Sequence, residues 1–214
     1  MFEDAKKYFP IIYDKNIPRD KRHEAIVPLW TGLHKELVGQ DLTKDKLRKI
    51  ILNSDFYFRH GIFEFLKAIT EHDINLVIPT AGIVGAIKQS IELLKSIMPL
   101  KEPLYFGTEE EYNDKELLVK FKEPVITTLN KSLLITHESC PFIKKGTNAI
   151  LLGDVIDDLY ITEKLQLDNI ITIGFFNTEL NMSKEEYSKE FDVTILNDGD
   201  LTYVTDLIKS LCSS

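Results

Sequence analysis

The chain has 214 residues, of which 43% are hydrophobic, 28% charged and 10% aromatic. This composition is typical of a globular protein and excludes the collagen-like, disordered and disulfide-scaffold classes. At roughly 100–200 residues per domain, the length allows one domain, or one domain with a small insertion. The net charge of -8 argues against a nucleic acid polymer as partner, because binding to a phosphate backbone needs a basic surface.

Membrane and redox features are equally plain in the sequence. No apolar run approaches the roughly 20 residues needed to cross a bilayer, so we expect no membrane partner. The two cysteines, Cys140 and Cys212, form neither a C-x-x-C motif nor a disulfide framework. A reducing compartment is therefore expected, and we predict a cytoplasmic protein and a monomer.

The first third of the chain predicts helices only. Apolar residues recur at helical spacing from Arg19 to Val38, and Gly39 is a stop signal. A second helix is expected after Thr43, a suitable N-cap. A third helix is expected from about Gly61 to Glu71, with four inward side chains: Phe63, Leu66, Ala68 and Ile69.

From residue 75 onwards, short buried-strand runs alternate with helices. The expected strands are 75–78, 149–152, 170–173 and 193–196, and the expected helices are 83–97, one ending near 165, 184–189 and 201–211. Residues 79–82 (P-T-A-G) predict a turn, and residues 104–131 an irregular stretch with short strands. Alternating strands and helices predict an α/β fold, with a parallel sheet covered by helices on both faces. We divide the chain into a helical segment at 1–60 and an α/β core at 61–214.

The strongest candidate site follows the strand at 149–152. In L-L-G-D-V-I-D-D-L (151–159), Asp154 comes directly after the strand and Asp158 four residues later. Ligands bind at the carboxyl ends of parallel strands, and two carboxylates there make an oxygen site suited to Mg²⁺. The alternative is that these acidic residues only cap a helix.

Two further candidates are weaker when taken alone. Thr80 lies in I-P-T-A-G-I (78–83), where backbone N–H groups at a helix start could bind phosphate, although a turn with an N-cap explains the same residues. Lys131, in N-K-S, is either a surface lysine or a cation that reaches the same strand ends. The five histidines lack metal-ligand spacing, and the signatures of serine hydrolases, P-loop enzymes and Rossmann dehydrogenases do not occur.

The order of these motifs, strand–Thr, then Lys, then strand–G-D-x-x-x-D, resembles motifs of the haloacid dehalogenase-like (HAD-like) phosphatases. Longer segments are similar to the eukaryotic pyrimidine 5′-nucleotidase family, also called cytosolic 5′-nucleotidase III. They are T-A-G-I (80–83), F-K-E-P-V-I-T-T-L-N-K (121–131), N-A-I-L-L-G-D-V-I-D-D-L (148–159), I-I-T-I-G-F-F-N (170–177) and F-D-V-T-I-L (191–196). The resemblance implies a HAD-like (Rossmannoid) core, with the N-terminal helices as a cap.

The resemblance also implies roles for individual residues. Thr80, with the backbone of Ala81 and Gly82, would hold the transferring phosphoryl group, and Lys131 would neutralise its oxygens. Asp154 and Asp158 would complete a Mg²⁺ site. The implied activity is Mg²⁺-dependent dephosphorylation of nucleoside 5′-monophosphates, chiefly pyrimidine ones, through an aspartyl-phosphate.

The chain departs from the family pattern at its nucleophile. The family opens with an apolar strand ending in D-x-D-x-T before the cap, and no such strand stands there in this sequence. We therefore expect a truncated or inactive form of the enzyme. Three alternatives stay open: a non-catalytic relative that binds a nucleotide or a protein, a phosphatase of another substrate, and a permuted enzyme that uses the D-x-D-x-T of Asp198, Asp200 and Thr202.

Overall fold

The computed structural model describes residues 8–12, 14, 16–55, 57–144, 146–177 and 183–213. Residues 1–7, 13, 15 and 56 of the expected helical cap lie outside this part. The helices are α2 (Phe9–Ile12), α3 (Arg19–Val38), α4 (Lys44–Leu52), α5 (Ile62–Glu71), α6 (Val84–Lys95), α7 (Lys184–Tyr187) and α8 (Thr202–Cys212), with 3₁₀ turns η1 (Lys131–Leu133) and η2 (Ile156–Thr162). The strands are β1 (Val77–Ile83), β2 (Leu104–Thr108), β3 (Glu110–Tyr112), β4 (Leu118–Phe121), β5 (Asn148–Gly153), β6 (Asn169–Phe176) and β7 (Val193–Leu196).

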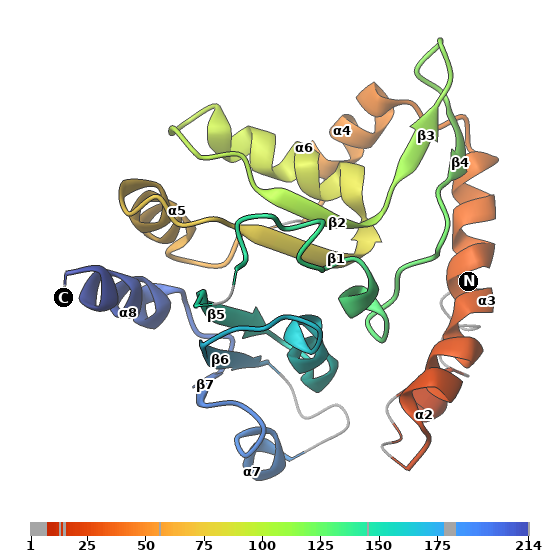
Figure 1. Cartoon of the computed structure of the whole chain (residues 1–214). Helices are drawn as coiled ribbons and strands as arrows, with labels where there is room; N and C mark the ends of the chain where they lie inside the picture. Colours follow the sequence, from red (N-terminus) through yellow and green to blue (C-terminus); the bar gives the residue numbers. More distant parts are fainter. Residues whose placement is uncertain are drawn as a thin grey trace.

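The N-terminal helices form much as the sequence predicts. Helix α3 has the expected bounds and ends at Gly39, and Thr43 caps α4 by accepting a hydrogen bond from the backbone N–H of Lys46 at 3.2 Å. Helix α3 lies along the β3–β4 hairpin (Figure 1). The hairpin thus connects the N-terminal helices to the rest of the molecule.

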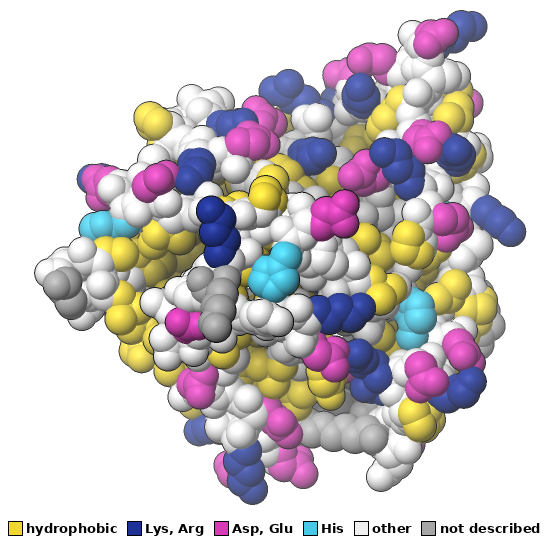
Figure 2. Space-filling view, in the orientation of Figure 1, with side chains coloured by type: hydrophobic (Ala, Val, Ile, Leu, Met, Phe, Trp, Pro, Cys, Tyr) yellow, Lys and Arg dark blue, Asp and Glu magenta, His cyan; other side chains and the backbone are white. Residues whose placement is uncertain are grey.

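One inward-facing residue of α5 was predicted wrongly. Phe63 is 44% exposed, whereas Phe65, which was not predicted to be inward, is 7% exposed. The buried face combines Phe65, Leu66 and Ile69, which are three and four residues apart, and Phe63 falls outside this stripe. Helices α5 and α8 pack together, and Figure 2 shows apolar side chains gathered between them.

The parallel α/β class is confirmed, but the strands fall into two parallel sheets. One sheet has the order β1-β2 and the other β5-β6-β7, while β3 and β4 form an antiparallel pair. Within the described residues, β1 and β5 each pair on one side only, so each is an inner edge facing the other sheet (Figure 1). The two sheets nevertheless share their cores: Ile78 and Ile150 pack in one apolar cluster, and Val77 and Leu151 in another.

Two local predictions were wrong, each for a local reason. The expected turn at 79–82 is part of β1, because pairing with β2 resumes at Ile83 opposite Thr108 after an irregularity. The helix expected to end near 165 is the tight turn η2, where the N–H of Asp158 bonds to the carbonyl of Val155 at 3.0 Å.

Among the described residues, no helix is both long and apolar enough to cross a membrane.

Candidate active site

The centre of the site is the turn that follows β5. The carboxylate of Asp158 turns back toward the strand, where Oδ2 accepts hydrogen bonds from the N–H of Asp154 at 3.2 Å and of Val155 at 3.4 Å. Gly153 makes this approach possible, because a Cβ atom there would lie 2.7 Å from the Cβ of Asp158. The buried carboxylate therefore closes the loop and orients Asp154.

Lys131 reaches the same carboxylate from a distant part of the chain. Its Nζ lies 2.7 Å from Asp158 Oδ1, and the two side chains are only 12% and 5% exposed. An ion pair this buried is held in place, since separating the partners would leave an uncompensated charge. The predicted proximity of Lys131, Asp154 and Asp158 is confirmed.

Asp154 has a different environment from Asp158. Its side chain lies at the surface, but neighbouring protein atoms displace part of its water, and this partial desolvation raises its pKa above the usual value. The charge of Asp158 raises the pKa further, while Lys131 and, more weakly, Arg59 oppose the shift. A cation placed beside Asp154 would relieve this repulsion.

Thr80 lies in β1. Strand β1 contacts η1, which begins with Lys131, and η1 contacts η2. The Thr80 Oγ1 accepts a hydrogen bond from the N–H of Gly82 at 2.9 Å, which leaves the hydroxyl proton able to donate elsewhere. The start of α6, predicted as a phosphate-binding helix end, is already capped, because the N–H of Gly85 lies 3.0 Å from both carboxylate oxygens of Glu110.

Sequence reasoning missed two arginines around this loop. Arg22, on α3, bonds to both oxygens of Asp157, at 3.1 and 3.2 Å, and so ties the N-terminal helices to η2. Arg59 lies 4.2 Å above the centroid of the Phe175 ring and pairs with Asp198 at 2.9 Å. No periodic or motif signal marks either arginine, since their partners are more than 100 residues away.

In the D-x-D-x-T segment of the permuted alternative, both carboxylates already make contacts within the protein. Asp198 pairs with Arg59, and Asp200 Oδ1 accepts from the N–H of Thr202 at 2.9 Å at the start of α8. That hydrogen bond is also the main reason that the pKa of Asp200 is lowered. Both carboxylates therefore have structural partners beside the start of α8.

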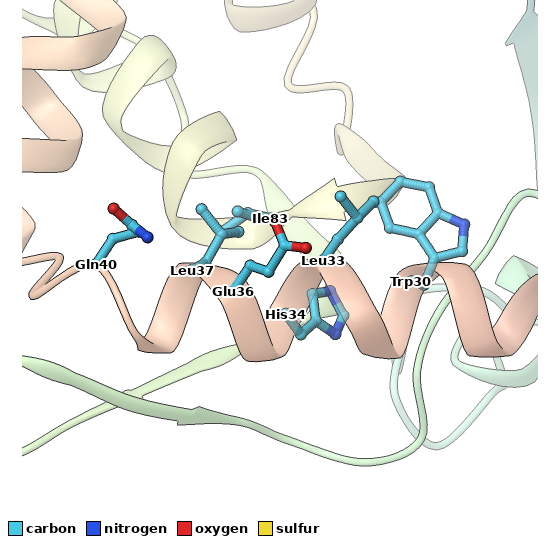
Figure 3. A pocket seen from close by; sticks show the side chains of 7 residues that line it. All are labelled: Trp30, Leu33, His34, Glu36, Leu37, Gln40 and Ile83. Carbon is cyan, nitrogen blue, oxygen red and sulfur yellow. The ribbon is translucent and has the colours of Figure 1, made fainter. Parts of the chain in front are cut away.

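A hollow of about 240 Å³ lies between α3 and the end of β1. Figure 3 shows Trp30, Leu33, His34 and Leu37 along α3, with Ile83 of β1 opposite. The indole Nε1 of Trp30 is buried and has no hydrogen-bond partner among the described residues. His34 stacks on Phe121 with ring centroids 4.2 Å apart, and burial lowers its pKa.

Comparison with known proteins settles the family. A family model described as pyrimidine 5′-nucleotidase (UMPH-1) matches residues 2–212. The chain belongs to this family. The 7-methylguanosine phosphate-specific 5′-nucleotidase of Gallus gallus is 26% identical over 218 residues, covering 97% of this chain and 75% of the relative. The Homo sapiens protein of the same name is 28% identical over 207 residues, covering 95% and 68%.

Solved structures share the fold. Cytosolic 5′-nucleotidase IIIB bound to cytidine matches with a TM-score of 0.77 at 19% identity, covering 97% of this chain and 70% of that one. A phosphoserine phosphohydrolase-like protein from Francisella tularensis matches with a TM-score of 0.58 at 14% identity, covering 96% and 84%. The HAD-like fold and the family resemblance are confirmed. The family is one of nucleotide phosphate hydrolases, and phosphatases of this fold generally use a divalent metal.

Proposed function

We propose that this protein hydrolyses nucleoside 5′-monophosphates at the carboxyl ends of β1 and β5, in the cytoplasm. The observation that carries the proposal is the buried Lys131–Asp158 pair beside Asp154. In the reaction, the bond between phosphorus and the ester oxygen breaks. Water supplies a hydroxyl group to phosphorus and a proton to the nucleoside O5′, so the products are a nucleoside and orthophosphate.

Lys131 and Thr80 are proposed to hold the phosphoryl group. An ammonium group has three N–H donors, and Asp158 uses one, so Lys131 keeps two for phosphate oxygens. The Thr80 hydroxyl proton supplies another donor, and the backbone of Ala81 and Gly82 lines the phosphate. Phosphoryl transfer depends chiefly on positioning and charge neutralisation, which these groups provide.

Mg²⁺ is the proposed metal, at Asp154 and Asp158. Within the described part of the chain, no group of three or more His, Cys, Asp or Glu residues could hold a metal. The donor set still fits, because Mg²⁺ in phosphate sites keeps several waters and takes one or two carboxylates plus the substrate phosphate. Asp154 is the direct ligand, and Asp158 supports it from its buried position. Bound Mg²⁺ would supply the charge that stabilises the phosphoryl oxygens.

The attacking carboxylate is proposed to come from a strand between β1 and β5. Asp158 is engaged by Lys131 and two backbone amides, and Asp154 is assigned to the metal. The inner edges of β1 and β5 face each other, and residues of both strands pack in the same two apolar clusters. A strand between these edges would therefore pair on two sides. Its carboxyl end would lie beside Thr80 and Asp154. We infer that the described residues do not themselves supply the attacking carboxylate.

The nucleoside is proposed to occupy the hollow at α3. Ile83, which lines it, is three residues after Thr80, so the hollow adjoins the phosphate segment. A flat ring with a hydrogen-bond acceptor suits the unpartnered Trp30 N–H. Relatives named for 7-methylguanosine phosphate and a structure holding cytidine support a nucleobase in this family.

The proposal is tested by measuring phosphate release. The 214-residue chain is compared with the same chain carrying an upstream apolar strand that ends in D-x-D-x-T, using CMP, UMP and 7-methylguanosine monophosphate. We expect Mg²⁺-dependent release only with the added strand. Nucleotide binding without release by either protein would favour a non-catalytic relative. Release by the 214 residues alone that Asp198→Asn abolishes would favour the permuted site.

A further inference from the structure

His23 of α3 contacts the turn that leads into Lys131. Its Nδ1 lies 3.1 Å from Thr127 Oγ1, and its Nε2 lies 3.4 Å from Asn130 Nδ2. Thr127 is fully buried and Asn130 nearly so, while His23 is half-buried at the edge of the contact. The imidazole therefore lies against the polar core of the turn.

The hydrogen bonds of the turn fix which group donates. Asn130 Oδ1 accepts from the N–H of Thr127 at 2.7 Å, and Asn130 Nδ2 donates to the carbonyl of Val125 at 3.0 Å. This orientation directs the second N–H of the amide at His23, so Nε2 must accept. Nδ1 then carries the proton and donates to Thr127 Oγ1, which also accepts from the N–H of Leu129 at 3.2 Å.

A protonated imidazole would break this pattern. With a proton on Nε2, two donors would face each other at Asn130, and the amide would lose its acceptor. The network is complete only with the neutral ring in its Nδ1–H form.

Arg22, the neighbouring residue on α3, contacts the segment that carries Asp158, the partner of Lys131 in the ion pair. Arg22 bonds to Asp157, which precedes Asp158, and His23 bonds to Asn130, which precedes Lys131. Two adjacent side chains of α3 thus bind the residues that directly precede Lys131 and Asp158. Those two residues form an ion pair at 2.7 Å.

We propose that Arg22 and His23 are positioning residues that set Lys131 against Asp158, and that His23 does so only as the neutral Nδ1–H tautomer. The inference rests on the proposed function for the use of the ion pair, but not for the contacts themselves. It makes the docking of α3 a condition for an ordered site. Acidification would protonate His23 and break its hydrogen bond with Asn130, whereas the contact between Arg22 and Asp157 would remain.

The charges around His23 agree with a neutral ring. Burial is the main influence and lowers the pKa of His23, while Glu24 on the same helix opposes it. Glu24 itself pairs with Lys21 at 2.8 Å, and the buried charges nearest the turn pair with each other, Arg22 with Asp157 and Lys131 with Asp158.

The first measurement is the imidazole nitrogen spectrum of the ¹⁵N-labelled full chain. We expect His23 to carry its proton on Nδ1 and to stay neutral below pH 6.5, the ordinary pKa of histidine. An Nε2–H tautomer, or a ring that becomes charged at or above the ordinary pKa, would overturn the proposal. This measurement needs no variant and no catalytic activity, so its outcome is independent of the proposed function.

The second measurement is amide hydrogen exchange at Thr127 and Leu129 in three variants. His23→Leu removes both hydrogen bonds and should lower protection about tenfold, whereas His23→Gln can accept and donate and should restore it. His72→Leu, at the exposed C-cap of α5, is the matched control and should change nothing. Wild-type protection, corrected for intrinsic exchange, should fall on acidification, and that of His23→Gln should not. Equal protection in the His23→Leu and wild-type proteins would contradict the assignment.

Discussion

The loop after β5 and the last residues of β1, which run directly into α6, both lie at the carboxyl end of a parallel strand, but they are held in different ways. The loop after β5 depends on a buried ion pair with Lys131, from a distant segment. At the end of β1, Thr80 accepts a hydrogen bond from the N–H of nearby Gly82, and the carboxylate of Glu110 caps the start of α6. The acidic loop is therefore the more sensitive of the two to single substitutions.

The largest effect is expected for Lys131→Ala. The change leaves Asp158 buried and charged without its partner, which should lower the free energy of unfolding by about 3–5 kcal/mol. Lys120→Ala is the control, because Lys120 pairs with Glu111 at the surface and should contribute less than about 1 kcal/mol. Urea unfolding measures both. Equal losses in the two variants would show that the buried pair has no special role.

Gly153→Ala should have the next largest effect. Its Cβ would lie 2.7 Å from the Cβ of Asp158 and 2.9 Å from Oδ2, so the loop must move, at about 1–3 kcal/mol. Gly32→Ala, inside α3 with no atom within 4 Å of the new Cβ, should instead stabilise by about 0.5–1 kcal/mol. Thermal unfolding of the pair checks the opposite signs. Destabilisation by Gly32→Ala, or none by Gly153→Ala, would contradict this packing.

A smaller effect is expected after β1. Glu110→Ala removes the acceptors of the Gly85 N–H, and the loss of such a cap costs about 1 kcal/mol. Glu109, the adjacent residue, pairs with exposed Lys122, so Glu109→Ala should cost less. The comparison uses urea unfolding at pH 7. A loss for Glu110→Ala as large as that for Lys131→Ala would remove the distinction between the two loops.

The smallest effect is a dependence on pH. Burial lowers the pKa of His34, so the unfolded chain binds a proton more tightly than the folded chain. This contribution to stability is complete above pH 6.5, the ordinary pKa of histidine, and is lost as pH falls toward the folded pKa. His34→Phe keeps a ring against Phe121 and should reduce the slope of stability against pH in this range. An unchanged slope would show that His34 does not titrate differently in the folded state.

What the sequence predicts and what it misses have physical reasons. Helical spacing and caps located α3 and α4, because those signals are local. The order of the motifs predicted that Lys131 and Asp158, which are 27 residues apart in the sequence, lie close together. Arg22 and His23 were missed because their roles depend on partners more than 100 residues away. The split between β1 and β5 was also missed, since pairing between strands leaves no mark in a single strand.

Asp154 and Lys131 are proposed to form part of a Mg²⁺-dependent nucleotidase site. The direct measurement is phosphate release from nucleoside 5′-monophosphates by the chain carrying the added strand, with Mg²⁺ or EDTA, and as wild type or Asp154→Asn. We predict release that requires Mg²⁺ and falls at least about a hundredfold in Asp154→Asn, as expected when a metal ligand is lost. Release that is unaffected by EDTA or by Asp154→Asn would exclude the proposed Mg²⁺ site.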